Sequence, residues 1–285
     1  MLKQEPLRAV LWMGGAVLSF STMAIAVREL RPMGAFEILF WRTGISFLIV
    51  AALLPRSGLA TLRTRRFGLH LLRNAVHFAG QYCWVYAIGA LSLATVFAIE
   101  FTMPVWTALL AALVLGERLT RPRVAMLVLG LAGVALILRP GSGGAFIELA
   151  AAVMLLGSLF YAAQFIVTKR LSASESPMAV LFWMSVIQSP VALVLAWPHW
   201  IPPSAAHVPW MIAIGVFSFA AHYCIMRALK IGDATLVVSI DFLRLPLIAV
   251  VGALLYSEPY DPMVFVGAAV IFAGTYFSLS REGRR

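Results

Sequence analysis

The sequence has little charge for its length. Asp, Glu, Lys and Arg together make up only 12% of its 285 residues, whereas 62% are hydrophobic. Soluble domains carry about 25% charged residues, so a chain of this composition cannot cover a water-facing surface with polar side chains. Together with a mean hydropathy of +0.93, this shortage excludes a soluble protein and predicts one that lies within a lipid bilayer.

Acidic residues and cysteines are also scarce. The 12 acidic residues are outnumbered by 22 Lys and Arg, which gives a net charge of +10. A basic chain can bind nucleic acid, but the basic residues of membrane proteins gather in cytoplasmic loops, so we expect no nucleic-acid partner. The two cysteines, Cys83 and Cys224, lie in apolar runs. We interpret both as small hydrophobic residues rather than as a disulfide.

Catalytic motifs are missing as well. The sequence contains neither H-E-x-x-H nor G-x-S-x-G, and no cluster of Asp or His follows an apolar run. We therefore expect no enzyme, no metal site and no cofactor. A membrane-embedded enzyme is the least favoured alternative.

What the chain does contain is a series of apolar runs. Each is about as long as the ~20 residues that a helix needs to cross a membrane. The runs predict an all-α membrane protein with ten transmembrane helices. The predicted spans are 7–27, 34–54, 67–88, 92–114, 123–138, 146–168, 178–197, 209–228, 235–256 and 262–280.

The two halves of the chain repeat each other at an offset of 141 residues. The matched residues are Tyr82 and Tyr223, Cys83 and Cys224, Glu100 and Asp241, and Glu117 and Glu258. The glycine-rich stretch 139–144 divides the spans five and five, which predicts repeats at residues 1–140 and 141–285. Because each half has an odd number of spans, the second half enters the membrane from the side opposite to the first half. We therefore predict a 5+5 inverted-topology repeat around a central cavity, as in alternating-access transporters.

Loop charges predict the orientation, because Lys and Arg concentrate on the cytoplasmic side. With both termini in the cytoplasm of a bacterium, the outer loops hold only Arg28, Arg31 and Arg139. The inner loops and tails then hold Lys3, Arg8, Arg56, Arg63, Arg65, Arg66, Arg118, Arg121, Arg123, Lys169, Arg170, Arg227, Lys230, Arg281, Arg284 and Arg285. We expect a multi-pass protein of the inner membrane, with the lipid bilayer as its surroundings and a monomer as its form.

Charges inside the predicted spans normally face the interior of a bundle, because lipid solvates them poorly. Glu100 and Asp241 can hold a substrate ammonium group or carry a proton. The alternative for Asp241 is a structural ion pair with Arg244, one helical turn away. Arg42 could hold a substrate carboxylate through two hydrogen bonds or neutralise Glu37 or Glu100, and we favour the structural role.

The third span predicts a wall of the cavity. Arg73, His77, Gln81 and Trp84 follow one another at helical spacing and share one face, with Tyr82 beside it. Aromatic rings of other spans can bind a substrate ring or an ammonium group. The further cavity residues that we predict are Trp41, Tyr161, Phe165, His222 and Tyr223.

Two prolines and two glutamates have mechanical roles in this interpretation. Pro104 and Pro246 remove a backbone donor near the membrane centre, so each offers a kink for gating and a free carbonyl. Glu117 and Glu258 end their spans. We expect both to be structural and to reach the amides that start the next helix.

Several short motifs carry a family resemblance. They are Phe40-Trp41-Arg42, Pro104, Gly116-Glu117-Arg118-Leu119, Gly130 and Gly133. With ten spans in two copies, the chain resembles the EamA-type branch of the drug/metabolite transporter (DMT) superfamily. Its length and aromatic content are similar to those of the aromatic amino acid exporters in that branch. The second copy departs from the pattern at Met184, which stands where Arg42 stands in the first.

The resemblance implies an exporter of amino acids, with a preference for aromatic or apolar side chains, that works by alternating access. The alternative on the same fold is an exporter of cationic drugs or other small metabolites. Either cargo is a small molecule that the predicted cavity would bind.

Overall fold

The computed structural model describes residues 4–58, 62–115, 119–139, 144–172, 174–231, 237 and 240–282. The regular structure in these ranges is helical throughout. In chain order the helices are α1 (Gln4–Glu29), α2 (Ala35–Ser57), α3 (Phe67–Ala90), α4 (Leu93–Glu100), α5 (Met103–Leu115), α6 (Arg121–Leu138), α7 (Gly144–Ser172), α8 (Pro177–Ala196), the short 3₁₀ turn η2 (Trp197–His199), α9 (Val208–Ile231), α11 (Arg244–Tyr256) and α12 (Pro262–Glu282).

Each of the ten predicted spans holds helix. Within the described residues, eight helical stretches are long and apolar enough to cross a membrane, and α11 is a shorter ninth. The span of α3 is 24 residues long but too polar to be counted with them. Its polar side chains, among them Arg73, His77 and Gln81, are buried, while its Leu71 and Leu72 are exposed. The prediction that this face looks inward is confirmed.

The fourth span is broken in its middle. α4 ends at Glu100, residues 101–102 form a turn, and α5 places Pro104 in its first turn. The carbonyl of Ile99 lies at this break, where it accepts from the amide of Thr102 at 3.0 Å and from the hydroxyls of Thr102 and Ser158 at 2.7 and 3.1 Å. The second copy has the same design, because a turn at residues 242–243 precedes α11 and Pro246 lies in its first turn.

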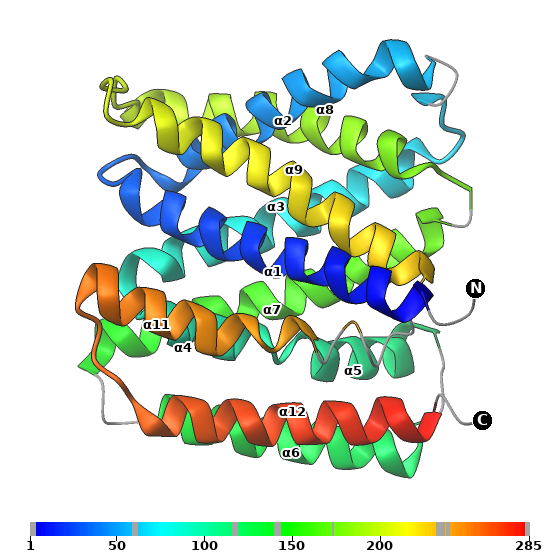
Figure 1. Ribbon diagram of the computed structural model, residues 1–285, viewed down its shortest axis with the longest axis vertical. Helices are drawn as coiled ribbons and strands as arrows, with labels where there is room; N and C mark the ends of the chain where they lie inside the picture. Colours follow the sequence, from blue (N-terminus) through cyan, green and yellow to red (C-terminus); the bar gives the residue numbers. More distant parts are fainter. Residues whose placement is uncertain are drawn as a thin grey trace.

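The helices are arranged as two copies that run in opposite directions. Both termini lie at one end of the bundle, and α1 runs away from that end while α7 runs toward it (Figure 1). The packing follows the same symmetry. α1 of the first half packs along α9 of the second, just as α7 of the second half packs along α3 of the first. The pairs α2 with α8 and α6 with α12 each join equivalent helices, and α4 packs on α11, the counterpart of α5 in the second copy. The predicted all-α, inverted-repeat fold is confirmed.

The repeated cysteines belong to two equivalent helix crossings. Both thiols are free. A Cβ added to Gly157 would lie 2.8 Å from the Cβ of Cys83, and one added to Gly15 would lie 3.1 Å from the Sγ of Cys224. A glycine on the first helix of each half thus makes room for a cysteine on the third helix of the other half. The interpretation of both cysteines as small packing residues fits this geometry.

α6 and α12 lie side by side at the edge of the bundle (Figure 1) and approach closely at two glycines. A Cβ on Gly133 would lie 2.6 Å from the carbonyl oxygen of Gly267, and the reverse distance is also 2.6 Å. Such a contact with a backbone oxygen cannot be relieved by a side-chain rotation. The two glycines therefore allow α6 and α12 to pack backbone against backbone through a reciprocal contact.

We expect Gly133→Ala to destabilise the protein by about 1–3 kcal/mol, the usual cost of overpacking a close contact. Thermal unfolding of the purified protein in detergent measures the effect. Gly44→Ala is the matched control, because a Cβ at Gly44, inside α2, meets nothing within 4 Å. Equal melting temperatures for the two variants would contradict the packing argument.

Candidate functional site

Arg244 joins the two breaks of the helical repeat. Its Nη2 donates to Oε1 of Glu100 at 3.1 Å and to Oδ2 of Asp241 at 3.2 Å. Glu100 is the last residue of α4, Asp241 directly precedes the turn of the second copy, and Arg244 starts α11. The two acids related by the repeat therefore meet on one guanidinium group. We call these three residues the acid centre.

Aromatic rings enclose the acid centre. The guanidinium carbon of Arg244 lies 4.8 Å from the ring centroids of Phe20 and Phe97, and 5.2 Å from that of Phe101. Phe101 in turn stacks on Phe242, its partner in the repeat, with centroids 4.1 Å apart. Cation–π contacts of this kind strengthen when water is excluded. The charges are thus held within the bundle and do not face lipid.

The acid centre has hydrogen-bonding capacity to spare. Trp84 Nε1 donates to the second oxygen of Glu100 at 2.9 Å. Among the described residues, Oδ1 of Asp241 and Nε of Arg244 have no partner. The side chains of Glu100 and Asp241 remain 15% and 23% exposed. A small polar group that enters the bundle can therefore contact a carboxylate of the acid centre without unfolding the protein.

A second polar group lies on the inward face of α3. Nδ1 of His77 is 3.0 Å from Nε2 of Gln188, and its other ring nitrogen is 3.5 Å from Nε2 of Gln81. The ring of His222, from α9, lies edge-on to that of His77 with centroids 5.8 Å apart. The Gln188 amide also donates to Oδ1 of Asn74 at 2.8 Å. Helices α3, α8 and α9 therefore share one buried polar network.

Arg42 lies beside this network and is one of the most buried side chains of the protein, with an exposed fraction of 1%. It interacts electrostatically with Arg73, His77 and His222. Within the described residues it makes no ion pair with Glu37 or Glu100, the two partners that we considered for it. Glu37 accepts instead from the amide of Ile201, at 3.1 Å. We call Arg42, Arg73, His77 and His222 the basic centre.

Tyr161 connects the two centres. The ring of this buried residue of α7 lies 6.2 Å, centroid to centroid, from that of His77, and its hydroxyl is within the electrostatic influence of Glu100, Arg244 and Arg42. Its ring packs on the backbone of α3, because Gly80 has no Cβ to displace it; a Cβ there would be 3.0 Å from the ring. The acid and basic centres therefore lie within reach of one residue.

The end of the bundle away from both termini, here the distal end, is held by Glu258. Its Oε1 accepts from Arg28 Nη2 at 2.6 Å, and its Oε2 accepts from the amide of Leu93, which starts α4, at 2.8 Å. Arg28 also donates to the carbonyl of Leu91. The expectation that Glu258 reaches the next helix, α12, is wrong, because its side chain folds back over Gly252 of α11 toward α4.

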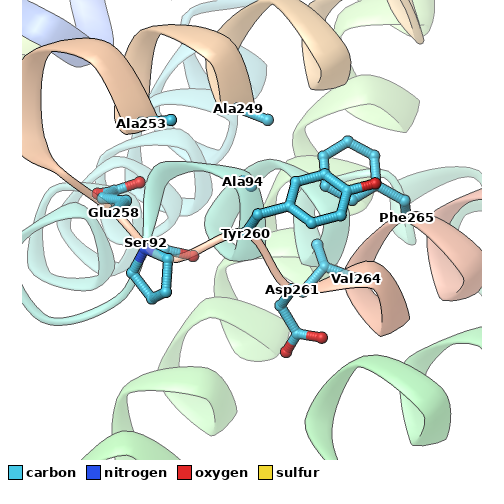
Figure 2. A pocket seen from close by; sticks show the side chains of 10 residues that line it. Ser92, Ala94, Ala249, Ala253, Glu258, Tyr260, Asp261, Val264 and Phe265 are labelled. Carbon is cyan, nitrogen blue, oxygen red and sulfur yellow. The ribbon is translucent and has the colours of Figure 1, made fainter.

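Little space is left between α4 and α11 at the distal end. The pocket there has a volume of about 20 Å³, which is room for about one water molecule. Figure 2 shows Glu258 and Ser92 on one side of it and the rings of Tyr260 and Phe265 on the other. At the opposite end, an open hollow of about 460 Å³ is lined by Arg8, Leu11, Trp12 and Arg227. This hollow lies on the outer surface of α1 and α9, because Arg8, Leu11 and Arg227 are exposed.

A buried charge cluster between two inverted repeats is typical of secondary transporters, and a comparison with known families supports that interpretation. The model of the EamA-like transporter family matches residues 7–139 and again residues 148–280. The chain belongs to this family. It is a multi-pass membrane transporter of the DMT/EamA type and not an enzyme.

Relatives of this EamA protein are named for several cargoes. The riboflavin transporter of Rhizobium johnstonii is 32% identical, over 100% of this chain and 96% of the relative. The S-adenosylmethionine uptake transporter of Rickettsia prowazekii is 25% identical over 87% of this chain and 84% of its own length. The pseudopaline exporter CntI of Pseudomonas aeruginosa is 29% identical over 95% and 94%. A solved crystal structure with 18% identity matches with a TM-score of 0.70 over 97% of this chain and 98% of that chain, which shows the fold.

The structure gathers seven of the eleven residues that we predicted for the cavity of this EamA protein. Those at the two centres are His77, Gln81, Trp84, Glu100, Tyr161, His222 and Asp241. Trp41 packs instead on Trp200, Tyr82 on Phe36 and Tyr223 on Trp12. The ion pair of Asp241 with Arg244, which we considered as the alternative to a substrate role, is present. Glu117 lies outside the described residues.

Phe165 does not join Tyr161, although it follows one turn later on α7. Its exposed fraction is 41%, whereas Tyr161 is buried. Gln164 and Thr168 are half-buried, and Thr168 accepts from Nε of Arg73 at 3.4 Å. The inward face of α7 therefore continues through spacings of three and four, which leaves Phe165 outside it.

Sequence reasoning missed the aromatic frame and the amide network of this EamA protein. The frame consists of Phe20, Phe97, Phe101 and Phe242, and the network adds Asn74 and Gln188. Phe101 and Phe242 match at the 141-residue offset, and that repeat is the signal that could have found them. Gln188 is an isolated amide in an apolar run of α8, a feature that indicates a buried polar contact.

Proposed function

We propose that the chain exports small amphipathic metabolites across the bacterial inner membrane by alternating access, with amino acids as the first cargo class. The observation that carries the proposal is the acid centre. Two acids from the two inverted repeats converge on one guanidinium group at the helix breaks, which is where transporters of inverted-repeat design bind substrate. Both termini are cytoplasmic in this proposal, so the distal end faces outward.

The two centres fit the chemistry of an amino acid. The partly exposed carboxylates of Glu100 and Asp241 can hold an ammonium group, and the basic centre can hold a carboxylate. The rings of Phe20, Phe97 and Phe101 offer an apolar surface to a side chain. These features support a preference for aromatic or apolar side chains. A purely cationic drug is less well served, because it would leave Arg42 of the basic centre without an anionic partner.

Riboflavin is the second candidate cargo. The observation that favours it is the 32% identity, over the whole chain, to a riboflavin transporter. The stacked rings of Phe101 and Phe242 lie beside the acid centre and are a suitable surface for a planar ring system. Riboflavin carries no charge at neutral pH, so its recognition would depend on this aromatic frame more than on the ion pairs.

In the proposed mechanism, the repeats 1–140 and 141–285 move against each other around the two centres. Pro104 and Pro246 stand next to the turns that separate α4 from α5 and precede α11. Few backbone hydrogen bonds cross a proline-flanked turn, so these points can bend at low cost. The cargo would enter from the terminal end and leave after the distal contacts break.

Transport by the purified protein in proteoliposomes tests the proposal. The panel consists of aromatic, apolar and charged amino acids, riboflavin and a cationic dye, each measured with and without a pH gradient. Export of amino acids that is inhibited by competing aromatic amino acids supports the first candidate. Uptake or efflux of riboflavin alone supports the second. No movement of any compound would contradict both. Equal transport rates with and without the pH gradient would exclude proton coupling.

Glu100→Gln is expected to lower transport of a cationic or zwitterionic cargo by about 10–100-fold. A hydrogen bond to a charged group contributes about 1.5–3 kcal/mol, and the variant removes that charge. The fold should survive, because Arg244 keeps Asp241 as its counter-ion. Asp261→Asn is the control for loss of one acid, since Asp261 lies at the distal surface. Equal transport by both variants would remove Glu100 from the substrate site.

A further inference from the structure

We infer that Arg42 forms, with the basic centre around it, a binding site for an anionic group of the cargo, a carboxylate or a phosphate. This inference rests on the proposed function and deepens it, because it selects among small metabolites those that carry a negative charge. It departs from the structural role that the sequence favoured for this residue.

The first observation is the isolation of the guanidinium group. Nε, Nη1 and Nη2 of Arg42 are all buried, and in the described part of the chain none of them has a hydrogen-bond partner. Burying an unpaired charge is among the most costly arrangements in a protein. An arginine used to stabilise the fold would have its donors satisfied by carbonyls or carboxylates. Five free donors in a planar fork instead match a carboxylate or phosphate group.

The second observation is the sign of the surroundings. Arg73 is also buried, and the partners that the structure gives it, Asn74 Oδ1 at 3.2 Å and Thr168 Oγ1 at 3.4 Å, are neutral. His77 and His222 complete the group. Of the acids of the interior, Glu100 and Asp241 are already bound to Arg244, and Glu37 accepts from the amide of Ile201. Two guanidinium groups therefore share a space in which the described residues supply no counter-ion.

The third observation is the asymmetry of the repeat. Met184 occupies the position of Arg42 in the second half, and it packs against Val50 and Leu181 in an apolar cluster. The fold therefore does not need an arginine at this point. Tyr161 lies beside His77 of the basic centre and within the electrostatic influence of Glu100, so a cargo with opposite charges would place its anionic group at Arg42 and its ammonium group at Glu100.

Binding to the purified protein in detergent tests the site with two pairs of compounds that differ only in an anionic group. Tryptophan is compared with tryptophan amide, and flavin mononucleotide with riboflavin, which separates a carboxylate from a phosphate source. We expect the anionic member of at least one pair to bind about 10-fold or more tighter than its neutral partner. In Arg42→Gln the two members should bind alike, and in Arg42→Lys part of the preference should return.

Arg65→Gln is the matched control, because it removes the same charge from an exposed position and should leave the preference unchanged. A second readout is the melting temperature without ligand. Arg42→Met should raise it by a few degrees, since a buried and unpaired charge is replaced by an apolar chain of similar length. An arginine that supports the fold would show the opposite.

The outcomes separate this inference from the proposed function. Transport with no loss of anion preference in Arg42→Gln would overturn the anion site and leave the transport proposal intact. A lower melting temperature for both Arg42→Met and Arg42→Gln would also overturn it, in favour of a structural role. If no compound is transported, the proposed function fails, and the melting temperature of Arg42→Met still decides whether Arg42 supports the fold.

Discussion

Arg244→Leu is expected to destabilise the protein by about 3–5 kcal/mol, the cost of removing one partner from a buried ion pair. The guanidinium group is only 4% exposed and is the common partner of Glu100 and Asp241. Without it, two carboxylates related by the repeat would face each other among the rings of Phe97 and Phe101 with no counter-ion. Transport should be lost together with stability.

A triple variant separates the two losses. Arg244→Leu combined with Glu100→Gln and Asp241→Asn leaves no charge in the acid centre, so most of the lost stability should return. Transport should not return, because the groups that hold an ammonium are gone. Thermal unfolding and proteoliposome transport are measured on the same preparations. A triple variant as unstable as Arg244→Leu would show that the aromatic frame requires the arginine for its shape and not for its charge.

The parts of the fold that the sequence predicted are those set by local pattern. The inward orientation of the polar face of α3 was predicted from polar residues at helical spacing, because lipid solvates polar side chains poorly. The inverted arrangement followed from an odd number of spans per repeat. The breaks near Pro104 and Pro246 followed from the missing backbone donor of proline. The first and third of these inferences use residues that are close together in the chain, and the second uses only the repeat and the number of spans in each half.

The contacts that the sequence did not predict join segments far apart in the chain. Arg244 and Glu100 are 144 residues apart, and Glu258 and Leu93 are 165 apart. The pairing of Arg42 with Glu37 or Glu100 was a reasonable expectation from charge balance. It failed because charge balance does not say where side chains point: Glu37 turns to the amide of Ile201 and Glu100 to Arg244. The packing of whole helices decides such directions.

The ion pair of Arg28 with Glu258 holds the distal end together. Glu258 ties three segments together, since Arg28 ends α1 and the amide of Leu93 starts α4. The side chains of Arg28 and Glu258 are only 17% and 11% exposed, so water screens their attraction little. A cargo that leaves through this end must first break these contacts. The ion pair therefore stabilises the state in which the distal end is narrow.

We expect Glu258→Gln to shift the protein about 10–100-fold toward a state open at the distal end, because it removes a charge-assisted contact of about 1.5–3 kcal/mol. The reporter is Ala249→Cys, at the wall of the small pocket, in a background with Cys83 and Cys224 replaced by alanine. Its alkylation by a membrane-impermeant maleimide should become faster by a similar factor. Gly252→Ala should act in the same direction without changing charge, because a Cβ there meets the carboxylate of Glu258.

Asp261→Asn is the control at the same end of the bundle. It removes the same charge from the pair that Asp261 forms with Arg139, in which the two side chains are 33% and 47% exposed. Exposed pairs contribute about 0–1 kcal/mol, so the alkylation rate should change little. If both variants accelerate alkylation equally, the distal end responds to total charge. If neither does, α4 and α11 are held together by their apolar packing, and cargo release would have to begin at that contact rather than at the ion pair.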